Sequence, residues 1–305
     1  MHTLSIVIPC LNEERNVEAL RAAIDALKLS VRLEYIFIDD GSMDATLSIL
    51  RKMNAEDERV RYISFSRSFG KESGIYAGLQ AASGDYTVTM DADLQHDPAL
   101  LPEMLAALES GEYDCAAACR TTRTGEPRLR SWFARRYYAL MSRYSEVALR
   151  DGSMDYRMMT RQVVEAVKSL GERGRFTKGI YQWVGFRTKW FEMKNVKRDR
   201  GLSKWSLESL FAYAINSIMA FSTAPLKLAS VLGVLSCAFS FVYLGYVVVD
   251  YFAFDQPFGV WPLLLCFMMM MGGLQLFVIG ILGLYISGIF REIKARPHYI
   301  VKESK

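Results

Sequence analysis

Two aspartates, two residues apart, follow a short apolar run in the first third of the chain. Asp91-Ala92-Asp93-Leu94-Gln95 comes directly after the β-rich residues 86–90. Side chains repeat every second residue in a strand, so Asp91 and Asp93 could point the same way at its carboxyl end. Two such carboxylates repel unless a cation lies between them, and hard oxygen ligands suit Mg²⁺ or Mn²⁺. The pattern predicts a divalent-metal site that could serve a nucleotide diphosphate. The alternative is a solvated acidic turn before a helix.

Short β-rich runs alternate with helical stretches in the N-terminal part of the chain. The expected strands are Leu4–Ile8, Tyr35–Ile38, Val60–Phe65 and Tyr86–Met90. The expected helices begin after Asn12 as a cap, lie near Ala45–Met53 and Gly70–Ala82, and begin at Asp97-Pro98. This alternation predicts an α/β fold with a parallel sheet covered on both faces. Such sheets bind ligands at the carboxyl ends of their strands, where the two aspartates would lie.

The C-terminal third carries two long apolar runs in a chain of 305 residues with a net charge of +4. The runs are about Pro225–Val249 and Trp261–Phe290, and no Lys or Arg occurs from Leu228 to Phe290. Each run exceeds the roughly 20 residues that a helix needs to cross a bilayer. We expect two membrane spans; the alternative, two buried helices of a soluble core, requires helices that are apolar on every side.

Basic residues flank the two runs but not the link between them. They are Lys194, Lys197, Arg198, Arg200, Lys204 and Lys227 before the first run, and Arg291, Lys294, Arg296, Lys302 and Lys305 after the second. The positive-inside rule then places the N-terminal domain and both termini in the cytoplasm, as a multi-pass protein of the cell membrane. We see no secretory signal peptide. The five cysteines form no metal-ligand pattern and are expected to be free thiols.

Two further segments have a composition that suits an anionic or membrane surface. Residues 120–136 are rich in arginine, and we expect a mobile basic loop, then an aromatic helix, that folds over phosphates. A solvated basic face is the alternative. Residues 205–221 place Leu207, Leu210, Phe211, Ala214 and Ile218 on one helical face, which suggests an interfacial helix or a core-packing one.

Ordered motifs along the chain resemble a known family. The first set is Ile8-Pro9-Cys10-Leu11-Asn12-Glu13-Glu14, Ile38-Asp39-Asp40-Gly41-Ser42, Phe69-Gly70-Lys71-Glu72 and Asp91-Ala92-Asp93-Leu94-Gln95. The second set is Asp155-Tyr156-Arg157-Met158-Met159, Arg175-Phe176-Thr177-Lys178-Gly179, Trp183-Val184-Gly185-Phe186 and Arg198-Asp199-Arg200-Gly201-Leu202-Ser203-Lys204. Together they resemble the inverting family 2 glycosyltransferases with a GT-A (Rossmann-like) fold. The second set resembles those that use a polyprenyl phosphate, such as dolichol-phosphate mannose synthases and bactoprenol glucosyltransferases.

The resemblance implies a role for each matching residue. Pro9, Leu11 and Glu13 would line the nucleotide pocket, and Asp39 or Asp40 would hydrogen-bond a uracil or guanine base. Asp91 and Asp93 would flank the sugar-nucleotide diphosphate. Listed by expected role, the catalytic residues are Asp91, Asp93, Arg120, Arg198 and Lys204, the further substrate-binding ones are Lys71, Arg157 and Lys178, and the Mg²⁺ or Mn²⁺ ligands are Asp91, Asp93 and Gln95. Arg120 would contact phosphate from the basic loop, and Arg198 and Lys204 would hold the acceptor phosphate. His96 is expected to be a loop residue rather than a metal ligand.

The expected reaction transfers one sugar from a nucleotide sugar to undecaprenyl or another polyprenyl phosphate. With a second pKa of about 6, a phosphate monoester is already largely a dianion at neutral pH, so it needs positioning rather than a general base. We therefore assign no base, and expect Asp155 to orient substrate or support structure. The resemblance favours UDP-glucose, although mannose, N-acetylglucosamine and modified arabinose donors also occur in relatives. The alternatives are a processive polysaccharide synthase and a non-catalytic membrane scaffold or flippase subunit.

The chain is expected to divide into four parts. These are a cytoplasmic catalytic domain (1–204), a juxtamembrane amphipathic helix (205–224), two transmembrane helices with a short external loop (225–290) and a basic cytoplasmic tail (291–305). Gly273, Gly280 and Ser287 recur every seven residues, and small side chains on one face favour close helix packing. The expected partners are the donor, the lipid, the membrane and a homo-oligomer, possibly a tetramer by resemblance, and no nucleic acid.

Overall fold

Apolar residues on alternate positions build a sheet that is buried on both faces. The computed structural model describes residues 1–120, 150, 152–193, 221–254 and 260–305. In β1 (Thr3–Cys10), Leu4, Ile6 and Ile8 belong to one core, whereas Val7 belongs to the core on the opposite face. A strand that is apolar on both sides needs helices over both faces, and the fold supplies them.

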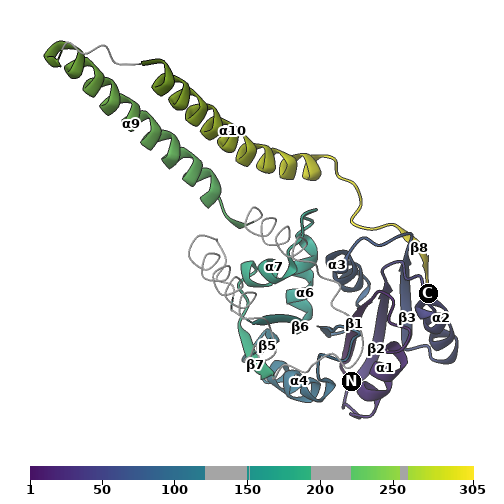
Figure 1. Ribbon diagram of the computed structural model, residues 1–305. Coiled ribbons are helices and arrows are strands. Elements are labelled where there is room, and N and C mark those ends of the chain that lie inside the picture. Colours follow the sequence, from purple (N-terminus) through teal and green to yellow (C-terminus); the bar gives the residue numbers. More distant parts are fainter. Residues whose placement is uncertain (121–149, 151, 194–220, 255–259) are drawn as a thin grey trace.

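The sheet has eight strands in the order β7-β5-β6-β4-β1-β2-β3-β8 (Figure 1). The strands after β1 are β2 (Arg32–Asp39), β3 (Val60–Phe65), β4 (Tyr86–Thr89), β5 (Cys115–Arg120), β6 (Ser153–Thr160), β7 (Thr188–Met193) and β8 (Val301–Ser304). The central strands β4, β1, β2 and β3 are parallel, as expected. The sheet is nevertheless mixed, because β6 and β8, which were not among the expected strands, are antiparallel to their neighbours β4 and β3.

Six helices of the described residues cover the two faces. The helices are α1 (Val17–Asp25), α2 (Thr46–Glu56), α3 (Lys71–Ala81), α4 (Leu101–Glu109), α6 (Arg161–Ser169) and α7 (Thr177–Trp183), with the 3-10 turn η1 (Pro98–Leu100) before α4. Side chains of α1, α2 and α4 pack into one core, and those of α3, α6 and α7 pack into the cores of the other face. Helix α3 lies very close to β1, since a Cβ on Gly78 would come within 2.1 Å of Val7.

The expected start of the first helix is wrong. Helix α1 begins at Val17, and Asn12 is not its cap but adopts a left-handed backbone with φ 55°. The Asn12 side chain accepts a hydrogen bond from the Met43 amide at 2.8 Å, and its own amide donates to Ser42 Oγ at 2.9 Å. Asn12 therefore joins the loops after β1 and β2. The expected cap at Asp97 is confirmed, because this side chain accepts from the Ala99 amide at 2.9 Å.

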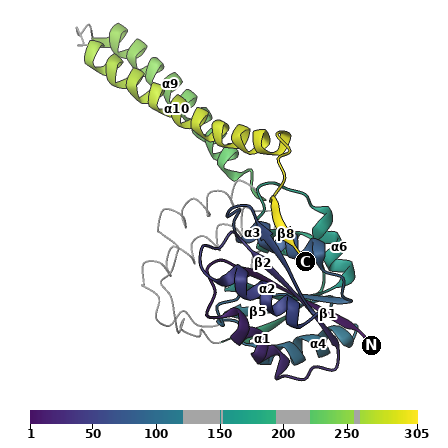
Figure 2. The ribbon, with the colours of Figure 1, turned by 90° about the vertical axis from the view of Figure 1, so that its right-hand side faces the viewer.

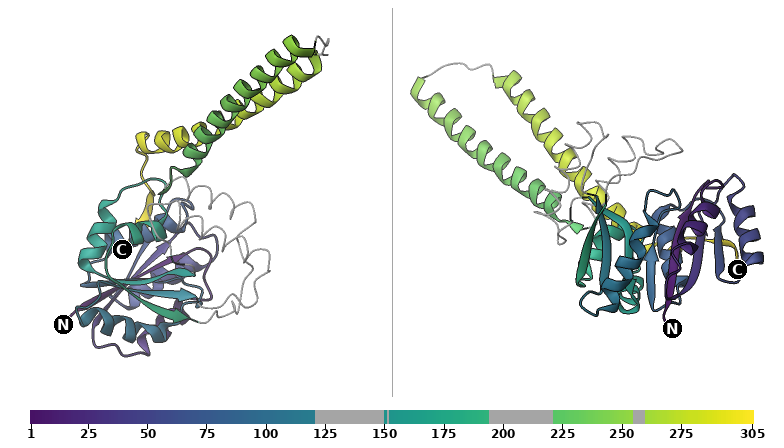
Figure 3. Two further views of the ribbon diagram at one scale, coloured as in Figure 1. Left: turned by 90° about the vertical axis from the view of Figure 1, so that its left-hand side faces the viewer. Right: turned by 90° about the horizontal axis from the view of Figure 1, so that it is seen from below.

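Two long helices extend from the sheet domain side by side, the first leading away from it and the second leading back (Figures 1, 2 and 3). They are α9 (Ala224–Phe254) and α10 (Val260–Ile293). Both are long and apolar enough to cross a membrane over Ala224–Tyr243 and Phe267–Ile293. Their large apolar side chains are exposed, with Phe241 at 76% and Leu276 at 72%. They are therefore not the core helices of a soluble domain.

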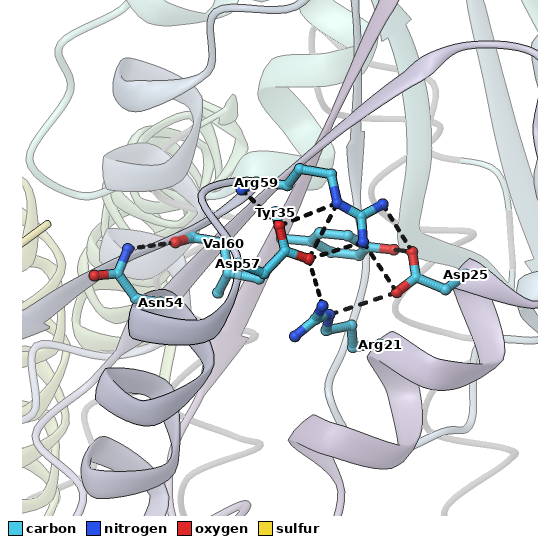
Figure 4. Close-up of polar contacts among 7 residues, drawn as sticks. All are labelled: Arg21, Asp25, Tyr35, Asn54, Asp57, Arg59 and Val60. Carbon is cyan, nitrogen blue, oxygen red and sulfur yellow. Dashed lines mark hydrogen bonds and ion pairs between the residues drawn. The ribbon is translucent and has the colours of Figure 1, made fainter.

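An ion-pair network joins α1 to the turn between α2 and β3 (Figure 4). Arg59 donates to Asp57 at 2.8 Å and to Asp25 at 3.2 Å, and Arg21 also pairs with Asp57. Tyr35 Oη donates to Asp25 at 2.9 Å. Arg59 directly precedes β3, so the network lies at the amino end of that strand, away from the carboxyl ends where ligands bind.

Candidate active site

A cavity of about 410 Å³ opens where β1, β2 and β3 end. Its lining residues are Leu11, Asn12, Asp39, Gly41, Ser42, Met43, Leu47, Ser64, Phe65, Ser66, Arg67, Ser68 and Lys302. This volume lies within the range of roughly 300–1,000 Å³ that is usual for small-molecule sites. The lining combines apolar side chains, such as Leu11, Leu47 and Phe65, with polar ones, a composition that suits a flat ring with polar edges.

The two aspartates at the end of β2 have different tasks. Asp39 lines the cavity, accepts from Ser42 N at 2.9 Å and from Ser64 Oγ at 2.7 Å, and is 1% exposed. An ionised carboxylate has about four lone-pair sites, so Asp39 can still accept a ligand N–H. Asp40 instead accepts from Phe69 N at 2.6 Å and Gly70 N at 3.0 Å, just before α3. Asp40 thus orders a loop, and Asp39 is the one that faces the cavity.

The loop geometry depends on a glycine. Gly41 has φ +74°, and a Cβ there would lie 2.7 Å from the Arg67 carbonyl carbon. Only glycine adopts this backbone without cost and leaves that space. Gly41 therefore allows the loop after β2 to approach the loop after β3, and the two loops form one wall.

Of the three residues expected to line the nucleotide pocket from the end of β1 and the loop after it, only Leu11 lines the cavity. Pro9 instead packs against α3, where a Cβ on Gly74 would lie 3.3 Å from its ring. Glu13 accepts from Asn16 Nδ2 at 2.7 Å, and its amide donates to Thr46 Oγ1 at 2.8 Å. Pro9 and Glu13 support the loop and are not among the residues that line the cavity.

A lysine between two carboxylates lies beside this cavity, at the end of β4. Lys71, the first residue of α3, places Nζ 2.7 Å from Asp91 and 2.7 Å from Asp155 of β6. A cation at a helix N-terminus is unfavourable by itself, and the two carboxylates compensate for it. The Lys71 side chain remains 37% exposed. This Lys71–Asp91–Asp155 cluster is therefore a charged group that a ligand can reach.

The charges in the cluster stabilise one another. Burial alone would lower the pKa of Lys71, but Asp155 and Asp91 together raise it well above its ordinary value. Burial would raise the pKa of Asp155, yet Lys71 and then Lys178 lower it far below the usual range. Burial likewise works against ionisation of Asp91, and Lys71 and His96 lower its pKa. Both carboxylates are ionised at neutral pH, so Asp155 is a poor general base.

Cys10 ends β1, the strand that lies between β2 and β4 in the sheet. Burial raises the pKa of its thiol, and the carboxylates of Glu13, Asp39 and Asp91 raise it further. Asp39 ends β2 and Asp91 follows β4, and both strands pair with β1. The two groups belong to a single site along the carboxyl ends of neighbouring strands. The thiol of Cys10 is buried and free, as expected.

The acidic turn differs in detail from the sequence expectation. Strand β4 ends at Thr89, and the residues after it turn away, with Leu94 at φ 58°. Asp91 and Asp93 therefore do not share one strand face. Asp93 accepts from the Gln95 amide at 3.2 Å. His96 is buried, accepts from the Asp91 amide at 2.9 Å and stacks on Tyr156, so it is a structural loop residue.

The acidic turn can supply only some of the ligands that a divalent ion needs. Among the described residues, no three His, Cys, Asp or Glu side chains come together as a metal site. Asp91 is already paired with Lys71. Asp93 and Gln95 offer a carboxylate and an amide oxygen, which suits an ion that takes its remaining ligands from phosphates and water. The donor set fits Mg²⁺ or Mn²⁺ in that role.

The remaining expected residues lie partly at this edge and partly elsewhere. Arg120 ends β5, and β5 and β4 both pair antiparallel with β6, so Arg120 ends at the same edge as Asp91. Lys178 of α7 is near enough to Asp155 to lower its pKa. Arg157 is 2% exposed, with its guanidinium carbon 4.7 Å from the Tyr181 ring and 5.4 Å from the Trp190 ring. Arg157 thus lies in the interior of the domain, and its expected role in substrate binding stays a prediction.

Several expectations lie outside the described residues. They are Arg198 and Lys204, the basic segment after Arg120, and the helix expected over residues 205–221, except Phe221. Phe221 is buried against Phe176 of the sheet domain, with ring centroids 5.9 Å apart.

Sequence reasoning missed three features of the site. Ser64–Ser68 line the cavity because β3 ends beside β2, and the rule of carboxyl ends could have found them. Lys302 lines the same cavity from the far end of the chain. No local sequence pattern predicts that Lys302 reaches the cavity. The pairing of Lys71 with Asp155 was also unforeseen, since 84 residues separate them.

Comparison with known proteins identifies the family of the chain. Residues 5–168 match glycosyl transferase family 2. The bactoprenol glucosyl transferase of Shigella phage SfV is 36% identical over 304 residues, which cover 99% of each chain. The prophage bactoprenol glucosyl transferase homolog of Escherichia coli K12 is 35% identical over 305 residues, again covering 99% of each chain.

A solved structure is similar over part of the chain. Glucosyl-3-phosphoglycerate synthase of Mycobacterium tuberculosis, in complex with Mn²⁺, UDP-glucose and phosphoglyceric acid, is 21% identical with a TM-score of 0.47. The match covers 72% of this chain and 78% of that one. This similarity is too distant to assign residue roles.

The family match, the mixed sheet and the two apolar helices confirm the fold class expected from the sequence, a GT-A α/β domain followed by two apolar helices. The match covers more than half of the chain, and the relatives cover nearly all of it. The chain belongs to glycosyl transferase family 2 and is a glycosyltransferase.

Proposed function

We propose that this enzyme transfers one glucose from UDP-glucose, with inversion, to undecaprenyl phosphate at the cytoplasmic face of the cell membrane. The observation that carries the proposal is similarity along the whole chain, apolar helices included, to proteins named bactoprenol glucosyl transferases. A soluble acceptor would give no reason for two helices with exposed apolar side chains. The cavity at the ends of β1 to β3 supplies the donor site.

The topology of the chain supports this placement. Helix α9 leaves the sheet domain, α10 returns, and the C-terminal residues form β8 in the same sheet. The catalytic domain and the C-terminus are therefore on one side of any membrane that the two helices cross. The basic residues on both flanks favour the cytoplasmic side.

Donor binding would use the charge pattern of the site. Asp39 accepts the ring N–H of the base in the cavity, and Leu11 packs on the ring. Asp93 and Gln95 would hold Mg²⁺ or Mn²⁺, which stabilises the charge that develops on the departing diphosphate. Lys71 keeps Asp91 and Asp155 ionised and fixed beside that region.

Acceptor activation would need no general base. A lipid monophosphate is already largely a dianion at neutral pH, so one of its oxygens can attack the anomeric carbon without losing a proton. Asp155 fits this scheme, since Lys71 and Lys178 hold its pKa well below the usual range and make it a weak base. Arg120, Arg198 and Lys204 would orient the phosphate, and arginine and lysine suit that task.

Transfer of radiolabelled sugar tests the proposal. The full-length protein in detergent is incubated with undecaprenyl phosphate and labelled UDP-glucose, GDP-mannose or UDP-N-acetylglucosamine in separate reactions. We expect a lipid product carrying one glucose from UDP-glucose. A polymeric product would favour a processive synthase, and label transferred only from another donor would refute the choice of sugar.

A further inference from the structure

One residue near the C-terminus, Lys302, lines the cavity at the ends of β1 to β3. β8 pairs antiparallel with β3 through Ser304 with Ile63, Glu303 with Ser64 and Val301 with Phe65. Between the pairs Glu303–Ser64 and Val301–Phe65, Lys302 has no partner residue on β3, and this extra residue makes a β-bulge in β8. Bulges redirect side chains, and Lys302 is the one residue of β8 that lines the cavity.

Several contacts hold β8 in this position. Arg51 of α2 donates to both carboxylate oxygens of Glu303, at 2.7 and 2.6 Å. Tyr62 and Lys305 exchange two backbone hydrogen bonds of 3.1 and 3.0 Å. Tyr299 stacks on Phe65, with ring centroids 4.8 Å apart. Phe65 itself lines the cavity, so the packing of the tail and the shape of the cavity are linked.

The same segment connects the cavity to the second apolar helix. Glu292, near the end of α10, accepts from the Arg173 amide at 2.7 Å. His298 then lies against Tyr76 of α3, with ring centroids 4.6 Å apart, before the chain reaches β3. β8 also covers the outer edge of β3, which would otherwise be an unpaired edge strand. The tail therefore brings Lys302 to the donor site from the membrane-facing part of the chain.

We propose that Lys302 is a donor-binding residue, whose ammonium donates a hydrogen bond to the C4 carbonyl oxygen of a uracil base. The inference rests on the proposed use of a nucleotide-sugar donor and adds a specificity determinant to it. Lys302 makes no ion pair within the described part of the chain, and it shares the cavity with Asp39. A carboxylate acceptor and an ammonium donor together match a ring N–H next to a carbonyl, as in uracil. Cytosine carries an amino group and lacks that N–H.

Binding measurements on Lys302→Ala test the inference. Calorimetry on the full-length protein in detergent would measure Kd for UDP and CDP, and competition against UDP would measure Kd for uridine. A hydrogen bond from a charged donor at an open site supports a loss of about threefold to tenfold. We expect this loss for both UDP and uridine, little change for CDP, and partial recovery in Lys302→Arg.

Lys305→Ala is the matched control, because Lys305 is a tail lysine whose side chain is not among those lining the cavity. This variant should bind UDP as the wild type does, and thermal unfolding should show that both variants are folded. A loss for UDP but not for uridine would assign Lys302 to a phosphate and overturn the proposal, as would unchanged UDP binding. If the wild type itself bound no UDP, the proposed donor, rather than the role of Lys302, would be refuted.

Discussion

Lys71 is the residue on which the charge balance of the site depends. It is the cation between Asp91 and Asp155, with Nζ 2.7 Å from each carboxylate. Without it, two carboxylates would face each other in a partly buried site, which disfavours ionisation of both. The ammonium group of Lys71 therefore keeps Asp91 and Asp155 ionised and holds their side chains in place.

Lys71→Met should reduce kcat/KM by about a hundredfold or more, since a preorganised charge at the reacting centre is lost. The acid limb of the pH–rate profile should also move to higher pH, because the pKa values of Asp91 and Asp155 rise without their cation. Lys52→Met, at an exposed lysine of α2, is the control. A variant with full activity and an unshifted profile would contradict the assigned role.

Asp93 is the second residue whose role can be tested singly. Asp93→Asn should abolish most transfer, and the wild-type enzyme should lose activity in excess EDTA and regain it with Mn²⁺ or Mg²⁺, since Asp93 would hold the ion. Asp97→Asn is the matched control, because asparagine also caps a helix and Asp97 caps η1. Turnover that survives both Asp93→Asn and EDTA would show that no metal is used.

At the scale of elements, the ion-pair network around Asp57 joins α1 to the start of β3 and lies away from the cavity. The hydrogen bond from Arg59 is the main cause of the lowered pKa of Asp57, which outweighs the opposite effect of burial. A carboxyl with a lowered folded-state pKa stabilises the fold above its unfolded pKa of about 3.9. That contribution is lost as the pH falls through the folded-state pKa.

Asp57→Asn should therefore cost about 1–2 kcal/mol of unfolding free energy at pH 7, and the difference from wild type should shrink below about pH 4. Urea unfolding of the full-length protein in detergent, followed by circular dichroism, measures it. Glu56→Gln, at an exposed neighbouring acid, should change stability by less than about 0.5 kcal/mol. A difference that grows toward acid pH would contradict the assignment.

At the scale of the whole molecule, the two apolar helices present glycines with nothing beside them. Apart from the adjoining backbone of α10 itself, no described atom lies within 4 Å of a Cβ built on Gly273 or Gly280. The helix α9 of the same chain therefore does not use these positions for close packing. We propose that a second copy of the chain does, because small residues allow the close helix approach that drives association in lipid.

Gly280→Leu should shift the mass of the detergent-solubilised protein toward the monomer and leave UDP binding intact, since a larger side chain prevents close approach. Light scattering with correction for detergent measures the mass. Ile279→Leu, at an exposed neighbouring position of α10, is the control. Equal masses for wild type and Gly280→Leu would show that this face does not carry the assembly.

The sequence alone determined the features that depend on local pattern. Short β-rich runs predicted β1 to β4, although β2 begins three residues earlier than expected, and long apolar runs predicted α9 and α10. The Asp39-Asp40 and Asp91–Gln95 motifs marked the ends of β2 and β4, because polar residues after a buried strand have few other places to go. The order of such motifs along the chain is enough to suggest the family, because it does not depend on how the motifs are arranged in space.

Tertiary structure alone decided which of these groups meet. Asp39 and Asp40 are neighbours in sequence, yet only hydrogen bonds from Phe69 and Gly70 show that Asp40 orders a loop. Asp155 meets Lys71 because β6 is antiparallel to β4, and Lys302 reaches the cavity because β8 adds to the edge of β3. Strand order and direction result from the packing of the whole chain, since no local pattern records a contact across 84 or more residues.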